Sequence, residues 1–428
     1  MYKVFAKTRS VCPVCLGTID AEKAVAGDGY VHLIKTCPEH GFFDTLIWEA
    51  GIVDYLKWGG TAPAAEPEDD CPRNCGLCAA HESEGCCVLL ELTRRCDLRC
   101  PVCFASAGGE GDLSLDEVAG LYDMLMARGG PYNIQLSGGE PTMRDDLPEI
   151  VRLGRERGFT FFQLNTNGLR LASEDGYAEK LREAGVSCAF LQFDGLRPET
   201  YKALRGRDIL EDKLRCIENC RAAGLPVVLV PTLVPGVNED EIGAILRFAL
   251  DRGRGVRGVH FQPVSRFGRC ELPELGTRLT IPRVLRDIEA QTEGLMRRED
   301  FGGGGAESPW CSFHASYRRL PDGGLKALPR RESACCCCKK SSEARDFVAG
   351  HWGAGEGPRE DEDGFDRFLR EAVENSFTVS GMAFMDADSL ELDRLRRCYI
   401  SEADAGRGMV PFCAYNLTAR DGMALYRK

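Results

Sequence analysis

The chain has 428 residues, of which 28% are charged, and a formal net charge of −12. This length predicts two to four domains, and the acidic balance disfavours a broad nucleic-acid surface, which needs an excess of lysine and arginine. No run of 18 apolar residues occurs, so we expect no membrane-spanning helix. The first residues, MYKVFAKTRS, lack the apolar core of a signal peptide, and we expect a cytoplasmic location.

The 22 cysteines are the unusual feature of this composition. In a reducing compartment, cysteines grouped two or three residues apart bind metals more often than they form disulfides. We therefore treat each group as a candidate metal site, in chain order.

Residues 1–60 carry Cys12, Cys15, Cys37 and His40 in the pattern C-x2-C followed by C-x2-H. This pattern approximates a zinc ribbon, and three cysteines with one histidine favour zinc. A rubredoxin-like iron site is the second interpretation, because it prefers four thiolates. We predict a small metal-binding knuckle.

Residues 61–86 begin with TAPAAEPEDD, which is typical of a linker. Three cysteines follow at C-x3-C-x2-C spacing: Cys71, Cys75 and Cys78. We expect an auxiliary [4Fe–4S] cluster here, with zinc as the alternative. The candidates for the fourth ligand are His81, Cys86, Cys87 and a cysteine from the C-terminal region.

Residues 87–290 alternate apolar runs of strand length with amphipathic segments. The runs are VLLELT (88–93), NIQLSGGE (133–140), FFQLNTNG (161–168), CAFLQFDG (188–195), VVLVPTLV (227–234) and GVHFQPVS (258–265). Such βα units predict an α/β fold with a parallel sheet covered on both faces. Six units suit an open, partial barrel, and a doubly wound sheet is the alternative. In both, ligands gather at the carboxyl ends of the strands.

The C-x3-C-x2-C spacing occurs again directly after the first of these strands, as Cys96, Cys100 and Cys103. A [4Fe–4S] cluster usually takes four thiolates, so three leave one iron open for chemistry. A ligand with an amine and a carboxylate would complete its coordination. The alternative is an electron-transfer or structural cluster whose fourth ligand comes from elsewhere in the chain.

This motif, followed by Phe104 and by SGGEP on the second strand, resembles the radical S-adenosylmethionine (SAM) superfamily. The resemblance implies that Cys96, Cys100 and Cys103 hold a [4Fe–4S] cluster at which SAM is reductively cleaved. The products are methionine and a 5′-deoxyadenosyl radical, which takes hydrogen from an unactivated carbon. It also implies a ferredoxin or flavodoxin as electron donor.

The same resemblance implies a set of SAM contacts at the strand ends. Glu140 and the backbone of Gly138 and Gly139 would hold the ammonium of SAM. The other expected contacts are Phe104 beside the cluster, Asn165, Thr166 and Asn167 at the ribose or methionine part, Asp194 at the ribose hydroxyls and Gln262 with Pro263 at the adenine. For these strand-end residues, a turn or capping role is the alternative.

Further motifs resemble one branch of the superfamily, which contains tetraether lipid synthases and pterin-methylating proteins. They are CPVC with CPEHG, CPxxCGLCxxH, LQFDG, GVHFQPVS and PFCAYN. The branch implies either carbon–carbon coupling of lipid alkyl chains, reached by peripheral membrane contact, or radical methylation of a small pterin-like substrate. We favour the lipid reaction here. An iron–sulfur electron carrier or metal-binding protein without SAM chemistry is the alternative of another class.

Residues 291–428 form a Cys-rich C-terminal region, from which we expect a second auxiliary cluster. Its candidate ligands are Cys311, Cys398, Cys413 and one or two of Cys335 to Cys338. Around Cys311 the branch usually carries C-x-H-P-x-C, whereas this chain reads CSFHASY. Ala315 and Ser316 stand where a second thiol is expected, which puts this cluster in doubt.

Overall fold

The computed structural model describes residues 1–60, 70–76, 78, 81–271, 278–304, 307–321, 324–329, 341–353 and 363–427. Residues 61–69 of the predicted linker and the run Cys335 to Cys338 lie outside the described residues. All other predicted metal ligands lie within them.

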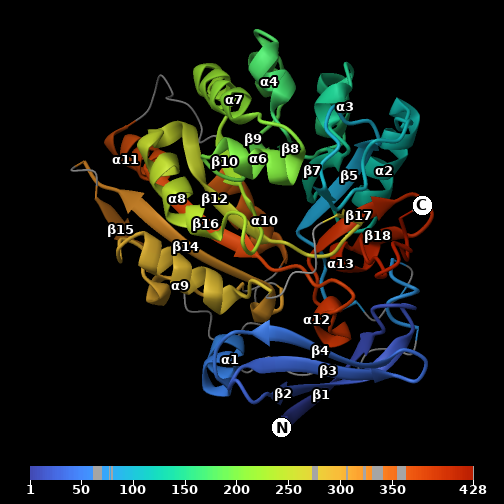
Figure 1. Ribbon diagram of the computed structural model, residues 1–428. Coiled ribbons are helices and arrows are strands. Elements are labelled where there is room, and N and C mark those ends of the chain that lie inside the picture. The colour runs from blue at the N-terminus through green and yellow to red at the C-terminus, as the bar shows by residue number, and fades with distance from the viewer. Residues whose placement is uncertain are drawn as a thin grey trace.

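The N-terminal knuckle is a four-stranded antiparallel sheet in the order β1-β2-β3-β4, coloured blue in Figure 1. Its elements are β1 (Lys3–Val11), β2 (Thr18–Val25), β3 (Val31–Cys37), β4 (Gly41–Trp48) and α1 (Ile52–Gly59). Trp48 lines a small cavity together with Pro263 and Ala383. The knuckle therefore packs against the main domain, where Tyr55 also stacks on Trp310 with ring centroids 4.9 Å apart.

All six predicted strands form, and they lie side by side as a parallel sheet in the order β5-β7-β8-β9-β10-β12. The strands are β5 (Cys87–Thr93), β7 (Asn133–Gly138), β8 (Phe162–Thr166), β9 (Cys188–Gln192), β10 (Val227–Val230) and β12 (Val256–Pro263). The connecting helices are α2 (Leu115–Ala127), α3 (Leu147–Glu156), α4 (Leu169–Ser173), α5 (Tyr177–Ala184), α6 (Pro198–Arg205), α7 (Leu210–Ala223) and α8 (Ile242–Asp251), and α9 (Ile281–Gln291) follows β12.

The C-terminal region extends both edges of this sheet. Beside β12 lie β16 (Ser376–Met382), β14 (Ser312–Arg319) and β15 (Leu325–Ala327); beside β5 lie β17 (Ile400–Asp404) and β18 (Gly408–Pro411). The remaining elements are β6 (Val102–Cys103), β11 (Thr232–Leu233), β13 (Arg269–Cys270), α10 (Ser341–Trp352), α11 (Gly364–Glu374), α12 (Leu392–Leu395) and α13 (Phe412–Tyr415). Strands before and after residue 290 share one sheet, although a domain boundary was predicted there. The predicted domain boundaries stay predictions.

The two faces of the core sheet differ in chemistry. Leu136, Leu164 and Leu191 belong to one apolar cluster with helix residues such as Ile150 and Leu181, and Figure 1 shows these helices around the outside of the sheet. Because alternate strand residues face opposite sides, their neighbours line the inner face. That face is covered in part by α10, through Trp352, and in part by the C-terminal segment.

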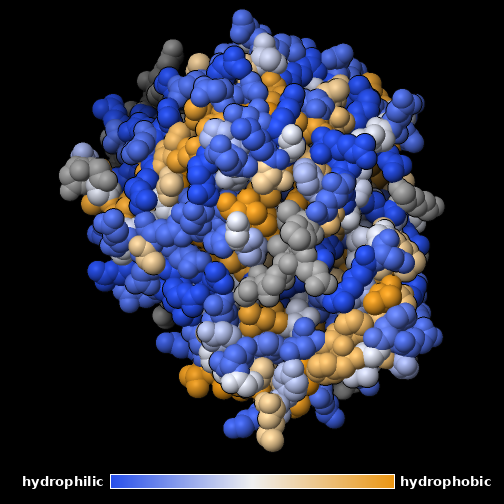
Figure 2. Space-filling model, viewed as in Figure 1, coloured by the Kyte–Doolittle hydropathy of each residue, from blue (hydrophilic) through white to orange (hydrophobic). Residues whose placement is uncertain are grey.

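The described surface is mainly hydrophilic on the face shown in Figure 2, with apolar side chains in separate patches. Among the helices of the described residues, none is both long and apolar enough to cross a bilayer.

Candidate active site

The loop after β5 carries Cys96, Cys100 and Cys103, and two arginines hold its backbone. Nε of Arg269 donates to the carbonyl oxygen of Cys100 at 2.7 Å. Nη1 of Arg205 donates to the carbonyl oxygen of Val102 at 3.2 Å. Cys103 lies in β6, which pairs with β13. All three cysteines are half-buried at the carboxyl end of the first core strand, where barrel folds place their ligands.

The glycines of SGGEP allow the end of β7 to touch the start of this loop. A Cβ on Gly138 would lie 2.4 Å from the carbonyl oxygen of Thr93, and one on Gly139 would lie 2.1 Å from that of Arg95. The backbone N–H of Gly139 donates to Thr93 at 2.7 Å, and that of Glu140 donates to Arg95 at 2.8 Å. No side chain fits at these two positions, so the motif fixes where the cysteine loop begins.

Glu140 is 2% exposed and connects the ends of β7 and β8. Its carboxylate accepts hydrogen bonds from Oγ1 of Thr142 and Oγ1 of Thr166, both at 2.7 Å, and from the backbone N–H of Asn167 at 2.6 Å. Burial raises the pKa of Glu140, and these hydrogen bonds oppose the shift. The predicted contact with the ammonium of SAM would add to this structural role.

The two predicted asparagines at the end of β8 point to different places. Nδ2 of Asn167 donates to Oδ1 of Asp97, inside the cysteine loop, at 2.6 Å. Asn165 instead contacts side chains of the inner sheet face: its Oδ1 accepts from Gln163 at 2.7 Å, and its Nδ2 donates to Gln135 at 3.2 Å. The structure therefore places Asn167, but not Asn165, against the cysteine loop.

Asp194 is fully buried and paired with Arg205, with Nε–Oδ2 and Nη2–Oδ1 distances of 2.7 and 2.6 Å. Its Oδ1 also accepts from the backbone N–H of Thr232 at 3.1 Å. Because Arg205 also holds the carbonyl of Val102, this pair anchors the cysteine loop to the ends of β9 and β11. Asp194 was expected at the ribose hydroxyls, and that role stays a prediction.

Two further predicted SAM neighbours lie at the same rim. Gln262 is partly exposed near the end of β12, where it is the register partner of Thr232 in β11. Phe104 packs on Phe412 of α13 with ring centroids 5.5 Å apart. The C-terminal segment thus reaches the cysteine loop.

Sequence reasoning missed Arg205 and Lys213. The side chain of Lys213 is fully buried in α7, and its Nζ donates to the carbonyl oxygen of Asn167 and to Oε1 of Gln192. Burial lowers the pKa of Lys213 to about 8. A sequence signal existed, because Lys213 shares the buried stripe of α7 with Cys216, Ile217 and Cys220.

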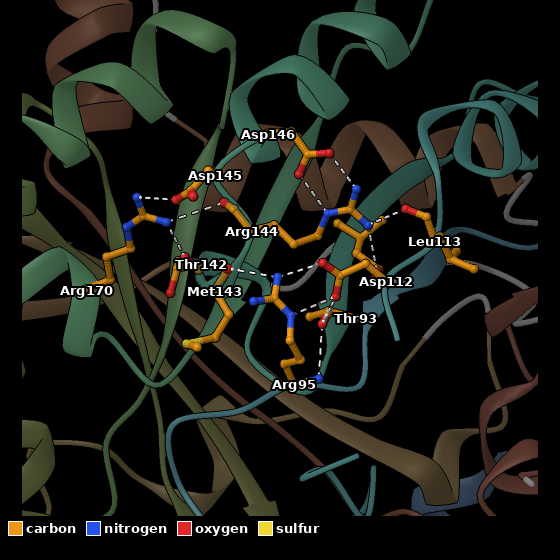
Figure 3. A network of polar contacts seen from close by, with 11 residues as sticks. Thr93, Arg95, Asp112, Leu113, Thr142, Met143, Arg144, Asp145, Asp146 and Arg170 are labelled. Carbon is orange, nitrogen blue, oxygen red and sulfur yellow. Dashed lines mark hydrogen bonds and ion pairs between the residues drawn. The ribbon is translucent and has the colours of Figure 1, made fainter. Parts of the chain in front are cut away.

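A polar network lies beside the cysteine loop (Figure 3). Arg95 pairs with Asp112, with Nη2–Oδ2 at 2.6 Å, and Nη2 of Arg144 pairs with Asp146, also at 2.6 Å. Nη1 of Arg144 donates to the carbonyl of Leu92 at 2.8 Å. These contacts tie the end of β5 to the loops before α2 and α3. They were not predicted, because no local pattern couples segments so far apart in sequence.

The three cysteines of the loop suit a cluster better than a free thiol role. Burial raises the pKa of Cys96 to about 12 and also raises the pKa of Cys100, which Arg205 partly offsets. A bound metal reverses this preference, because coordination deprotonates a thiol. Cysteine thiolates are the usual ligands of [4Fe–4S] clusters. The donor set therefore fits a [4Fe–4S] cluster at this loop.

The knuckle gathers Cys12, Cys15, Cys37 and His40 with their ligand atoms within 4.8 Å of one another. Nδ1 of His40 lies 3.6 Å from the sulfur of Cys12 and 3.4 Å from that of Cys37. The hydrogen bond with His40 lowers the pKa of Cys37 to about 6. Three sulfurs and one imidazole nitrogen around one point fit a tetrahedral zinc ion.

The earlier triplet lines a separate cavity of about 140 Å³, together with Arg128, Arg396 and His81. The triplet residues on this cavity are Cys71, Cys75 and Cys78. Of the proposed fourth ligands, His81 lines the cavity, and its Nε2 lies 2.7 Å from the carbonyl oxygen of Cys398. Cys86 and Cys87 are buried beside each other and do not line it.

Cys311, Cys398 and Cys413 come from distant segments and lie close enough to influence one another. Burial raises the pKa of each, and the charge of Cys398 adds to the shift of Cys413. Nη2 of Arg394 donates to the sulfur of Cys311 at 3.2 Å. The predicted second auxiliary site therefore has three thiols in one neighbourhood.

Comparison with known proteins identifies two domains in this arrangement. Residues 90–249 match the model of the Radical SAM superfamily, and residues 4–49 match the HMPTM N-terminal zinc ribbon domain. The chain thus belongs to the radical SAM superfamily and carries an N-terminal zinc ribbon. The sequence-based predictions of this superfamily, of the partial barrel and of the zinc knuckle are confirmed.

Three curated relatives show which members of the superfamily this chain is similar to. The chain is 42% identical over 307 residues to 7,8-dihydro-6-hydroxymethylpterin dimethyltransferase of Methanocaldococcus jannaschii, covering 69% of this chain and 60% of the relative. It is 33% identical over 188 residues to GTP 3′,8-cyclase of Listeria monocytogenes, covering 42% and 55%. It is 36% identical over 189 residues to Fe-coproporphyrin III synthase of Methanosarcina barkeri, covering 40% and 46%. The chain spans about half to three fifths of these relatives.

Proposed function

We propose that this protein is a radical SAM enzyme that methylates a small pterin-like substrate. The observation that carries the proposal is the 42% identity to a pterin dimethyltransferase over 307 residues, which is 69% of this chain. Our preference for lipid carbon–carbon coupling is corrected here, because none of the three relatives named acts on lipid by name.

The inner face of the barrel gives independent support. Gln135, Asn165, Gln192 and His260 are all partly exposed on that face. Nε2 of Gln135 and Nε2 of His260 have no hydrogen-bond partner among the described residues. An alkyl chain bound against them would bury these atoms unpaired, at a cost of about 1–3 kcal/mol each. A polar heteroaromatic ring would offer these atoms hydrogen-bond partners, which favours a pterin-like substrate.

The residues of this chain would hold the cluster and fix the position of the loop that carries it. Cys96, Cys100 and Cys103 would hold the [4Fe–4S] cluster, which supplies the electron that cleaves SAM. Gly138 and Gly139 fix the start of the cysteine loop, and Arg205 with Asp194 fixes its end. A loop held in this way would keep the cluster in place at the barrel mouth, and the barrel walls would exclude water from the reaction.

We also propose the finer features that accompany this function. Cys71, Cys75 and Cys78 would hold an auxiliary [4Fe–4S] cluster, and the Cys311 neighbourhood would hold a second one. A small ferredoxin or flavodoxin would deliver the electron. The knuckle would bind zinc through Cys12, Cys15, Cys37 and His40.

Anaerobic reconstitution tests the proposal. The methyl carbon must come from a one-carbon donor, either a second molecule of SAM, which would leave as S-adenosylhomocysteine, or a reduced pterin that carries a methylene group. The full chain, loaded with iron and sulfide, is incubated with SAM in excess, such a methylene carrier, dithionite and 7,8-dihydro-6-hydroxymethylpterin, and products are separated by mass spectrometry. We expect 5′-deoxyadenosine and a pterin heavier by one or two methyl groups. Deoxyadenosine without any modified pterin would overturn the substrate assignment. A loaded cluster whose electron paramagnetic resonance spectrum does not change with SAM would favour an electron carrier.

A further inference from the structure

The inner face of the barrel carries a row of three carboxamides that do not contact the cysteine loop at the carboxyl ends of the strands. Gln135 in β7 and Gln163 in β8 are register partners, and Asn165 lies two residues further along β8. All three side chains lie on the face opposite to Leu136 and Leu164, which pack against the outer helices. The row therefore faces the interior of the barrel.

The three carboxamides form a hydrogen-bonded chain with both ends open. Nε2 of Gln163 donates to Oδ1 of Asn165 at 2.7 Å, and Nδ2 of Asn165 donates to Oε1 of Gln135 at 3.2 Å. This leaves Nε2 of Gln135 as a donor and Oε1 of Gln163 as an acceptor, without a partner among the described residues. Gln163 as a whole is 3% exposed and Gln135 is partly exposed, and neither open atom is among the fully buried unpaired atoms, so both stay available to a ligand.

An aromatic ring lies next to this row. Phe190 in β9 is the register partner of Asn165, is partly exposed, and its ring centroid lies 6.0 Å from that of His260. Aromatic faces bind other rings by offset or edge contacts. The neighbouring carboxamides are neutral, so they suit an uncharged polar ligand better than a phosphate or carboxylate.

We infer that Gln135, Gln163 and Asn165 read the hydrogen-bonding edge of the substrate ring, with Phe190 against its face. Carboxamides carry a donor nitrogen and an acceptor oxygen on the same carbon, which matches the alternating N–H, ring nitrogen and carbonyl of a pterin-type edge. This inference rests on the proposed function and names the residues that select its substrate. It assigns Asn165 to the substrate in place of the SAM contact expected from sequence.

Anaerobic titration calorimetry without reductant tests the inference on the full, reconstituted chain. The ligands are SAM and, in the presence of SAM, 7,8-dihydro-6-hydroxymethylpterin. The variants are Asn165→Leu and Gln135→Met, which keep the approximate side-chain size and remove the amide. The matched control is Asn219→Leu, because Asn219 is a half-buried carboxamide of α7 that bonds the backbone of Leu171.

We expect each row variant to raise the dissociation constant of the dihydropterin at least fivefold and that of SAM less than twofold, while the control changes neither. A change of less than fivefold for the dihydropterin in both row variants would overturn the inference. The inference would also be overturned if the dissociation constant of SAM rose more than that of the dihydropterin. That result would show that the three carboxamides contact SAM. If the wild-type chain binds SAM but not the dihydropterin, the proposed function fails, and this inference fails with it. Gln135→Met keeps the test decisive if Asn165→Leu does not fold.

Discussion

The two C-x3-C-x2-C triplets of this chain share their spacing and differ in their surroundings. Cys96, Cys100 and Cys103 follow β5, and Gly138, Gly139 and two arginines contact the backbone of their loop. Cys71, Cys75 and Cys78 lie outside the barrel, on a cavity shared with Arg396 and His81. The shared spacing leads us to propose the same kind of metal group at both triplets, and their different surroundings lead us to propose different roles.

The largest expected effect is the loss of SAM cleavage when one cysteine of the first triplet is replaced. Cys96→Ala is expected to abolish formation of 5′-deoxyadenosine, because an incomplete ligand set cannot hold the catalytic cluster. Iron content should fall by about four per chain, the number in one such cluster. Chromatography of the reaction products and an iron assay measure both. Retained SAM cleavage in this variant would show that another group carries the chemistry.

The matching change in the second triplet is expected to uncouple the reaction. Cys75→Ala should leave 5′-deoxyadenosine formation measurable and remove the methylated product, because its cavity lies apart from the SAM-binding rim. The same product analysis on both variants gives the comparison. If Cys75→Ala abolished SAM cleavage and Cys96→Ala did not, the two triplets would have to exchange roles.

The close approach at Gly139 predicts a loss of SAM cleavage that is smaller than in Cys96→Ala. It should affect only the function of the first triplet. In Gly139→Ala the new Cβ would lie 2.1 Å from the carbonyl of Arg95, so the start of the cysteine loop must move. We expect at least a tenfold loss of SAM cleavage. Gly120→Ala is the control, because Gly120 is exposed in α2 with nothing within 4 Å. That change should stabilise the helix by up to about 1 kcal/mol. Equal activity in both variants would contradict the role of the glycine pair.

The N-terminal knuckle extends the comparison to a site expected to hold one metal ion instead of a four-iron cluster. Cys37→Ser is expected to remove one zinc per chain and to lower the melting temperature, since a structural zinc contributes to folding. The knuckle also contacts the main domain, with Lys23 2.6 Å from Glu391 and Nζ of Lys35 2.7 Å from the carbonyl of Ala387, so these contacts should loosen. SAM cleavage should persist. Metal analysis by mass spectrometry checks the loss, and iron instead of zinc in the wild type would favour the rubredoxin-like interpretation.

The smallest expected effect concerns a buried acid in β17, the strand that pairs with β5. Glu402 in β17 is 1% exposed, and neither carboxylate oxygen has a hydrogen-bond partner among the described residues. Burial, and next the charge of Glu91, raise its pKa well above the usual value, while Arg427 opposes this. The folded chain therefore keeps this proton at pH values where an unfolded glutamate, with a pKa of about 4.3, has lost it. Its contribution to stability is present below that pH and is lost as the pH rises towards the folded pKa.

Glu402→Gln has no proton to lose, so it should remove this pH dependence. Relative to wild type, the variant should gain about 1 kcal/mol or more in unfolding free energy between pH 5 and pH 7, because one pKa unit corresponds to about 1.4 kcal/mol. Urea unfolding at several pH values measures it. Parallel pH profiles of the two proteins would show that Glu402 is ionised in the folded state.

The amino-acid sequence by itself determined the local parts of this protein. The apolar runs predicted all six core strands within a few residues, because strand burial leaves a continuous apolar signal. Cysteine spacing predicted the four knuckle residues that the fold brings together, and the metal binding of the two triplets stays a prediction. The superfamily and the branch could also be read from such motifs.

Tertiary structure decided which of these parts meet. Only the fold shows that residues 376–382 and 400–404 extend opposite edges of the core sheet, that Arg205 links Asp194 to the cysteine loop, and that Asn165 points away from Asn167. Adjacent strand residues alternate between faces, so a strand-end motif does not state which side chain reaches which ligand. That choice depends on sheet register and on contacts between residues far apart in sequence, which no local pattern encodes.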